Sequence, residues 1–255
     1  MKTGEVILAL CVLTMGGVIA VKAATRTSPA PARVATKSDD DSIYKVPLKR
    51  TAAERMRVAE ARATEVKQAI GERGGATFIN DILRENDSTV RHWTARGGAP
   101  VRIWLQVPQG VNDYRATFPG FVTQALDGWS AVDGMPVRFE IVNDSSSAHV
   151  VVIWTPMLQG NRIGLTRIEA VNDTIRTGRI TIATQREGGI ALKDEDIARC
   201  ALHEVGHLLG LAHTADLASI MAPESAQSGL SMRDRATAQL LYALPIGSIK
   251  SGATW

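Results

Sequence analysis

Apolar residues in the middle of the chain gather in strand-length runs, each bounded by turn-forming residues. The runs lie at 101–107, 137–142, 149–154, 163–170 and 178–184. Short apolar runs rich in Val and Ile and bounded by Gly, Asn, Asp or Pro are typical of β-strands. We therefore predict five strands, all of them beyond Gly97 and Gly98.

Longer segments with helical spacing of apolar residues interrupt and follow these strands. One segment, 118–132, lies between the first two strands, and a second, 193–211, follows the fifth. A last helix over 232–244 ends before Pro245, because proline cannot continue a helix. The order strand, helix, four strands, helix predicts an α+β fold, in which helices pack on a mixed sheet of about five strands.

A further helix is predicted nearer the N-terminus. Thr51 and Glu54 form a capping-box pattern, and Ala-rich, charge-rich sequence continues to Gly71. Its apolar stripe consists of Met56, Ala59, Ala63, Val66 and Ile70. A stripe so poor in large side chains buries little surface. The sequence leaves two interpretations open, a solvated spacer helix and a pro-segment or partner-docking helix.

The longest apolar run, residues 6–21, follows a short head that carries Lys2 and precedes Lys22. Its sixteen residues fall short of the roughly 20 that span a bilayer comfortably. Cleavage after Ala23 would satisfy the small-residue rule of signal peptidases. The run is interpreted as an export signal, with a retained membrane anchor as the alternative. Both predict an extracytoplasmic protein, and the anchor predicts membrane association through residues 6–21.

Charge and cysteine content exclude several classes of protein. Basic residues exceed acidic ones by only 29 to 26 and are scattered, so we expect no nucleic-acid-binding surface. The two cysteines are Cys11, inside the apolar run, and Cys200. A processed chain would keep only Cys200, which excludes an internal disulfide. Folding must therefore rest on a core, a metal ion, or both.

Three histidines have the spacing of a metal site. His203 and His207 are four residues apart in the predicted helix 193–211, which places both imidazoles on one face, about one turn apart. Gly210 can adopt a left-handed conformation, end the helix and let His213 approach the same ion. Three neutral nitrogen donors leave one position of a zinc ion open, and an open position is typical of catalytic zinc.

Glu204 follows His203 and points slightly around the helix, too far for a ligand but beside the open position. A water in that position is acidified toward a pKa of about 7, and Glu204 can then act as its general base. His-Glu-x-x-His alone arises by composition in about one chain in a hundred of this length. The added Gly210 and His213 make coincidence roughly a thousandfold rarer. The sequence thus predicts one catalytic Zn2+.

Two motifs make the chain resemble the metzincin zinc peptidases. The first is His203-Glu204-x-x-His207-x-x-Gly210-x-x-His213, and the second is the Met-turn pattern Ser219-Ile220-Met221. Within that clan the matrixin type fits best, since Thr214 follows the third histidine and no Tyr stands two residues after Met221. The resemblance covers about residues 101–242 and includes Asp234 in the last predicted helix.

This resemblance implies a zinc-dependent endopeptidase that acts on protein or peptide substrates. It implies that His203, His207 and His213 bind the metal and that Glu204 is the base and then the proton donor. The implied fold is a twisted mixed sheet with an active-site helix and a C-terminal helix, and its edge strand, within 163–170, aligns extended substrate. A Pro-Arg-Cys-Gly-type switch segment and the further histidines of a structural zinc site are missing from the sequence.

Packing or turn formation explains the remaining candidates more simply. His92 and His149 lack partners at ligand spacing, and a lone histidine is more often structural. Cys200 is expected as a small buried residue, since a thiolate on the histidine-bearing helix would compete with the open position. The Asn-Asp pairs at 143–144 and 172–173 suit turns, so Ca2+ binding has no clear motif to support it.

These observations divide the chain into five expected parts. They are a signal peptide or membrane anchor (1–24), a disordered linker (25–44), a helical spacer or pro-segment (45–96), a zinc metalloprotease catalytic domain (97–245) and a flexible tail (246–255). The alternative to a peptidase is a zinc-stabilised extracytoplasmic binding or adhesion module without significant turnover. The carboxylate of Glu204 favours the enzyme, because a purely structural site has no use for it. The sequence gives neither the cleavage preference nor the oligomeric state.

Overall fold

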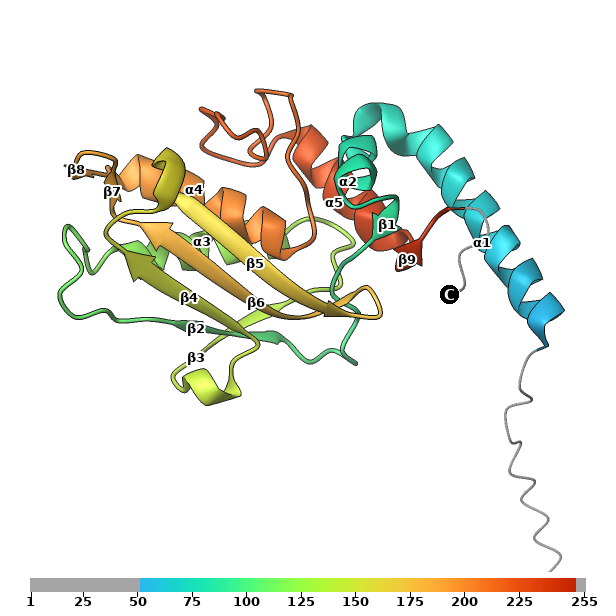
Figure 1. Ribbon diagram of the computed structural model, residues 1–255, viewed down its shortest axis with the longest axis horizontal. Helices are drawn as coiled ribbons and strands as arrows, with labels where there is room; N and C mark the ends of the chain where they lie inside the picture. The colour runs from blue at the N-terminus through green and yellow to red at the C-terminus, as the bar shows by residue number, and fades with distance from the viewer. Residues whose placement is uncertain (1–50, 251–255) are drawn as a thin grey trace, which may run out of the picture. The chain divides into compact units, whose positions relative to one another are not determined.

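The computed structural model describes residues 51–250, and a five-stranded mixed sheet runs through them (Figure 1). The strands, in order across the sheet, are β3 (Phe139–Val142), β2 (Val101–Leu105), β4 (Val150–Thr155), β6 (Thr174–Ala183) and β5 (Gly164–Val171). The first four are parallel, whereas β5 runs antiparallel to β6 and forms one edge of the sheet. The predicted α+β class is confirmed.

Two helices cover one face of this sheet (Figure 1). α3 (Phe118–Ser130) and α4 (Asp194–Leu208) pack on each other, and α4 also contacts β5 and β6. The indole N–H of Trp129 on α3 donates a 2.8 Å hydrogen bond to the carbonyl of Leu202 on α4. The strand residues that face the helices are at most 1% exposed: Val101, Ile103, Val150, Val152, Ile180 and Ile182. This core fixes the histidine-bearing helix against the edge strand.

The elements begin and end close to the predicted residues; the last helix, α5, for example, spans Met232–Ala243. The clear exception is a strand. Strand β6 begins at Thr174 rather than at 178, because a tight turn leads directly from β5 into β6. Asn172 and Asp173 form this turn with φ of 49° and 58°. Two residues with positive φ are typical of such hairpin turns, so the pair at 172–173 has the turn role expected of it.

The segment before Gly97 differs from the exposed spacer that its composition suggests. α1 (Ala52–Arg73) begins with the predicted capping box, and its C-terminal half packs, since Val66 is 1% and Met56 62% exposed. A 3-10 turn, η1 (Gly74–Ala76), leads into an unpredicted helix, α2 (Ile79–Glu85).

Contacts tie this segment to the last two helices. The backbone N–H of Phe78 donates to the hydroxyl of Thr237 on α5 (3.0 Å), and the indole N–H of Trp93 donates to the carbonyl of Leu208 (2.8 Å). The described residues all belong to one compact unit, Lys49–Trp255. The core therefore extends past the boundary expected at residue 97, because large apolar side chains follow the thin stripe of the first helix.

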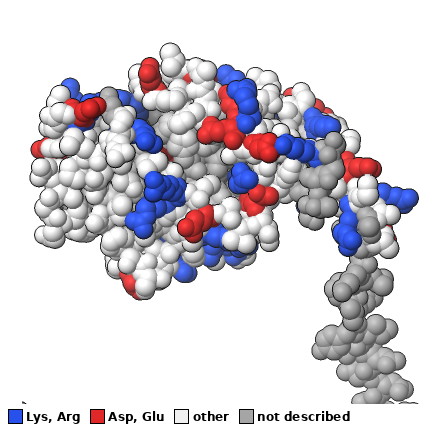
Figure 2. Space-filling model, viewed as in Figure 1, with Lys and Arg blue, Asp and Glu red and all other residues white. Residues whose placement is uncertain are grey.

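Two small sheets of short strands lie outside the five-stranded sheet. β9 (Gly247–Ser248) pairs antiparallel with β1 (Thr89–Val90), so the beginning of the expected flexible tail is held by backbone hydrogen bonds. β7 (Gln185–Arg186) and β8 (Ile190–Ala191) form a small hairpin. Acidic and basic side chains are interspersed on the face in Figure 2, as the scattered charges of the sequence predict.

Some predictions concern residues that the structure does not describe. The export signal or anchor at 6–21 and the linker at 25–44 lie outside residues 51–250, as do the last five residues of the tail. Within residues 51–250, no helix combines the length and the hydrophobicity that a membrane span requires.

Replacing Phe78 with Ala tests whether residues before Gly97 belong to the core. Phe78 is 2% exposed, and truncation of a buried Phe lowers the free energy of unfolding by about 3–5 kcal/mol. Chemical denaturation of the full chain measures this loss. Val107, which is 74% exposed, supplies the control, since Val107→Ala should change the same quantity by about 0.5 kcal/mol or less. Equal losses in the two variants would contradict the assignment of Phe78 to the core.

Candidate metal centre and active site

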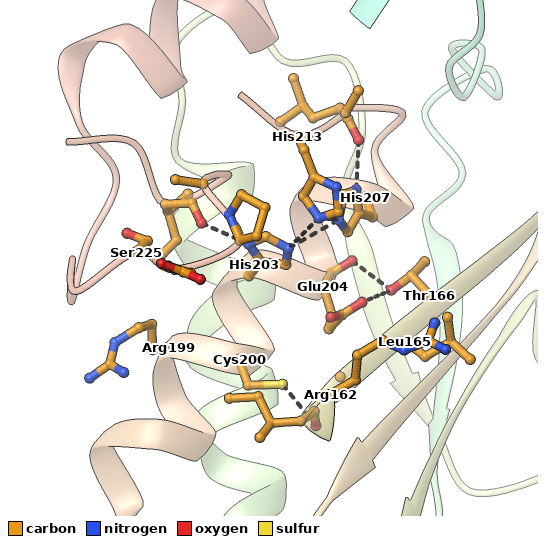
Figure 3. Close-up of a pocket in the computed structure, with 18 of the residues that line it drawn as sticks. Arg162, Leu165, Thr166, Arg199, Cys200, His203, Glu204, His207, His213 and Ser225 are labelled. Atoms are coloured by element: carbon orange, nitrogen blue, oxygen red, sulfur yellow. Dashed lines mark hydrogen bonds between the residues drawn. The ribbon is translucent and has the colours of Figure 1, made fainter. Parts of the chain in front are cut away.

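α4 presents His203 and His207 one helical turn apart, and the chain turns back immediately after the helix. At this turn Gly210 has φ +99°, and a Cβ atom there would lie 2.2 Å from the carbonyl oxygen of Arg91. Only glycine satisfies both conditions. The turn brings His213 against the other two histidines, as the spacing predicts (Figure 3).

The Nε2 atoms of the three histidines converge on one point. They lie 3.0 Å apart for His203 and His207, 3.3 Å for His203 and His213, and 3.2 Å for His207 and His213. The Nδ1 atoms of the first two lie 2.7 Å and 2.8 Å from the carbonyl oxygens of Ile220 and Leu211. Because a carbonyl oxygen only accepts, these Nδ1 atoms carry the protons, and the Nε2 lone pairs face inward.

The environment of the histidines favours neutral imidazoles and a cation between them. Desolvation lowers the pKa of His203, and desolvation together with neighbouring His203 lowers the pKa of His207 to about 3. Converging lone pairs repel one another unless a cation separates them. Tetrahedral zinc, with Zn–N bonds of roughly 2.0–2.1 Å, holds its nitrogens about 3.3 Å apart. The observed separations of 3.0–3.3 Å fit that ion.

A turn at Met221 packs against the metal-site helix. A Cβ atom on Gly206 of α4 would lie 2.3 Å from the sulfur of Met221, so glycine here allows close packing. Asp234 of α5 is fully buried and accepts hydrogen bonds from the Ile220 N–H (3.2 Å) and from two serine hydroxyls. It therefore fixes the backbone whose Ile220 carbonyl orients His203.

Asp234→Asn should lower the free energy of unfolding by about 1.5–3 kcal/mol, because hydrogen bonds to a charged group contribute about that much. The amide keeps the shape of the side chain but loses the charge and one acceptor. Denaturant unfolding measures the difference. Asp133→Asn is the control, since Asp133 is exposed. An Asp234→Asn variant as stable as the control would contradict this role for Asp234.

Glu204 lies beside the histidines and against the edge strand β5. Its side chain is 5% exposed, and this burial raises the pKa of Glu204 to about 7, although a hydrogen bond from Thr166 opposes the rise. The Thr166 hydroxyl lies 2.6 Å from Oε2 of the carboxylate (Figure 3). A Cβ atom on Gly164 would lie 2.2 Å from Oε1, so the carboxylate fits because residue 164 is glycine.

The histidines and Glu204 open into a cleft of about 870 Å³. Strand β5 contributes Gly164 to Thr166 and Ile168 to its lining, and the segment after the Met221 turn contributes Ala222 to Ser225. The cleft therefore has the volume to hold a peptide segment, and one of its walls is β5, the edge strand of the sheet.

The other candidate residues have local partners. His92 is buried, and its ring nitrogens lie 2.7 Å and 3.1 Å from two backbone carbonyl oxygens. His149 accepts a 2.9 Å hydrogen bond from the Arg102 N–H. Cys200 is buried and its thiol contacts the Ile163 carbonyl at 3.3 Å. These contacts agree with the packing roles expected of the three residues.

Sequence reasoning did not identify Gly164 and Thr166. Both follow the start of a predicted strand, and nothing in the local pattern separates them from ordinary strand residues. Their importance depends on which face of β5 meets α4, which the register of the whole sheet decides.

The comparison with known families agrees with this geometry. Residues 110–243 match the Matrixin family, peptidase M10, and the match covers 134 of the 255 residues. It includes the three histidines, Glu204 and most of the sheet. A search of curated proteins finds no match. The family match, the mixed sheet and the three converging histidines lead to one conclusion: the chain belongs to the matrixin family of zinc metalloendopeptidases.

Proposed function

We propose that this protein is an extracytoplasmic endopeptidase in which His203, His207 and His213 hold one zinc ion and Glu204 is the general base. The supporting observation is that three Nε2 atoms converge within 3.3 Å of one another beside a carboxylate that is 5% exposed. Structural zinc has four protein ligands, whereas three side chains converge here among the described residues.

The chain's own residues are arranged for proton transfer. When bound, zinc polarises the scissile carbonyl and lowers the pKa of the attacking water. The carbonyls of Ile220 and Leu211 orient two of the histidines before any metal binds. Glu204 accepts the proton of the water as its oxygen attacks, and then donates that proton to the leaving amine. A pKa of about 7 suits a group that must act in both directions near neutral pH.

The edge of β5 suits an extended substrate. Among residues 51–250, β5 pairs with β6 and with no strand on its other side, so its outer edge offers backbone donors and acceptors beside the cleft. An extended peptide can add to such an edge as a further strand. We therefore propose that protein or peptide substrates bind antiparallel or parallel to β5, with the scissile bond opposite the histidines.

The location outside the cytoplasm rests on the N-terminal sequence and on the family, whose members are typically secreted. We propose that residues 1–24 form a signal peptide or a membrane anchor and that residues 25–44 form a linker. If the signal is cleaved, N-terminal sequencing of exported protein should give a start near Ala24. An intact Met1 confined to membranes would favour the anchor.

Incubating the purified full chain with a mixed peptide library, with and without a zinc chelator, tests the proposed activity. Mass spectrometry of the products should give internal cleavage sites that disappear with the chelator and return with added zinc. A zinc-loaded protein that binds peptides and cleaves none would support the binding module instead.

A further inference from the structure

Thr166 on β5 donates a hydrogen bond to the carboxylate of Glu204. Its hydroxyl oxygen lies 2.6 Å from Oε2 of Glu204 and 3.0 Å from the Glu204 backbone carbonyl. Figure 3 draws both contacts between the strand and the helix. Among residues 51–250, no other side chain donates a hydrogen bond to this carboxylate. The position of Oε2 therefore depends on one hydroxyl.

The proton of that hydroxyl is directed to the carboxylate. A hydroxyl has one proton, and a charged acceptor forms the shorter and stronger hydrogen bond. The backbone carbonyl of Glu204 has a partner of its own, because it lies inside α4, where residue 208 supplies the helical N–H. The 2.6 Å contact to Oε2 is thus the bond that Thr166 makes.

Oε1, the second carboxylate oxygen of Glu204, receives no hydrogen bond from the part of the chain that the structure describes. Oε1 faces Gly164, two residues before Thr166 on the same side of β5, and the missing side chain of Gly164 gives it room. Strand β5 thus contacts both oxygens of the carboxylate: Thr166 holds Oε2 by a hydrogen bond, and Gly164 leaves space for Oε1. Thr is β-branched and stiff at χ1, which makes its hydroxyl a well-defined anchor.

We infer that Thr166 is a positioning residue for the reaction, holding the carboxylate of Glu204 in the orientation that accepts the proton of the attacking water. This inference rests on the proposed role of Glu204 as the base. Thr166 acts through that carboxylate, which accepts the hydrogen bond of its hydroxyl. Replacing the Thr166 side chain should therefore lower kcat rather than raise KM, because the backbone of β5, which aligns the substrate, stays the same.

Four variants of the full chain, each loaded with zinc, separate this role from packing: Thr166→Val, Thr166→Ala, Thr166→Ser and the control Thr177→Val. Thr177 lies on β6 of the same hairpin and also donates to a glutamate, with 2.9 Å between its hydroxyl oxygen and Oε2 of Glu169, but its side chain is exposed. The readouts are kcat and KM for one peptide substrate, together with zinc content.

Thr166→Val and Thr166→Ala should lower kcat by up to about 10²-fold with KM little changed, the loss expected when a catalytic group is misplaced. Thr166→Ser should restore most of kcat, because it keeps the hydroxyl. Thr177→Val should match the wild type. Comparing Ala with Ser at 166 remains decisive if Val disturbs folding, since both lack the methyl group and only Ser keeps the donor.

A double variant shows whether Thr166 acts through Glu204. In a Glu204→Gln background, Thr166→Ala should cause no further loss of kcat beyond that of Glu204→Gln alone. Equal kcat values for the Ala and Ser variants, or a change confined to KM, would overturn the positioning role. A Glu204→Gln variant with wild-type kcat would instead overturn the proposed function itself, so the two failures are distinguishable.

Discussion

Glu204→Gln is expected to lower kcat by about 10²–10⁴-fold, the usual contribution of a general acid–base residue, or by more. The amide has nearly the shape of the carboxylate but cannot take a proton from water at neutral pH. Its neighbours, Gly164 and Thr166, leave space for a group of that shape. Steady-state kinetics on a peptide identified from the library measures the loss.

Zinc content and melting temperature should change little in this variant, because Glu204 contributes no ligand in the proposed site. Peptide binding should also persist, since the edge of β5 is untouched. Cleavage at the wild-type rate would remove Glu204 from the mechanism. A wild type that cleaves nothing, yet binds peptide as well as its Gln variant does, would support the binding module.

Replacing both His203 and His207 with Ala should abolish zinc binding and, with it, all peptide cleavage. The two residues supply two of the three converging nitrogens, and a single imidazole on the exposed His213 cannot hold the ion by itself. Elemental analysis of the purified variant should fall from one zinc per chain to a trace.

His149→Ala is the matched control for that double variant. His149 is also a partly buried histidine with two hydrogen-bonding partners, Arg96 and Arg102, but it lies outside the cluster. The control should retain one zinc per chain. Full zinc content in the His203→Ala, His207→Ala protein would refute these two residues as ligands.

The parts of the fold that the sequence predicts best are those in which local pattern and tertiary contact agree. His203 and His207 share a helix face because their spacing matches one turn, and Gly210 ends that helix with the positive φ expected of it. The five main strands were predictable for the same reason, since their apolar runs are bounded by turn residues.

The parts that the sequence does not predict depend on distant partners. α2 has only seven residues, too few for helical periodicity to emerge, and its burial comes from contacts near α5. The bond from Trp93 to Leu208 joins residues 115 positions apart. Thr166 meets Glu204 only because β5 crosses α4 in one register. Local sequence carries no signal for such pairings.

Stepwise return of zinc to metal-free protein tests the central claim most directly. The full chain is stripped with a chelator, the chelator is removed, and peptide cleavage is measured as zinc is added in known amounts. A single site formed by His203, His207 and His213 predicts that activity rises in proportion to zinc and reaches its plateau at one equivalent per chain. Cleavage that persists in fully stripped protein, or that never appears at one equivalent, would contradict the account.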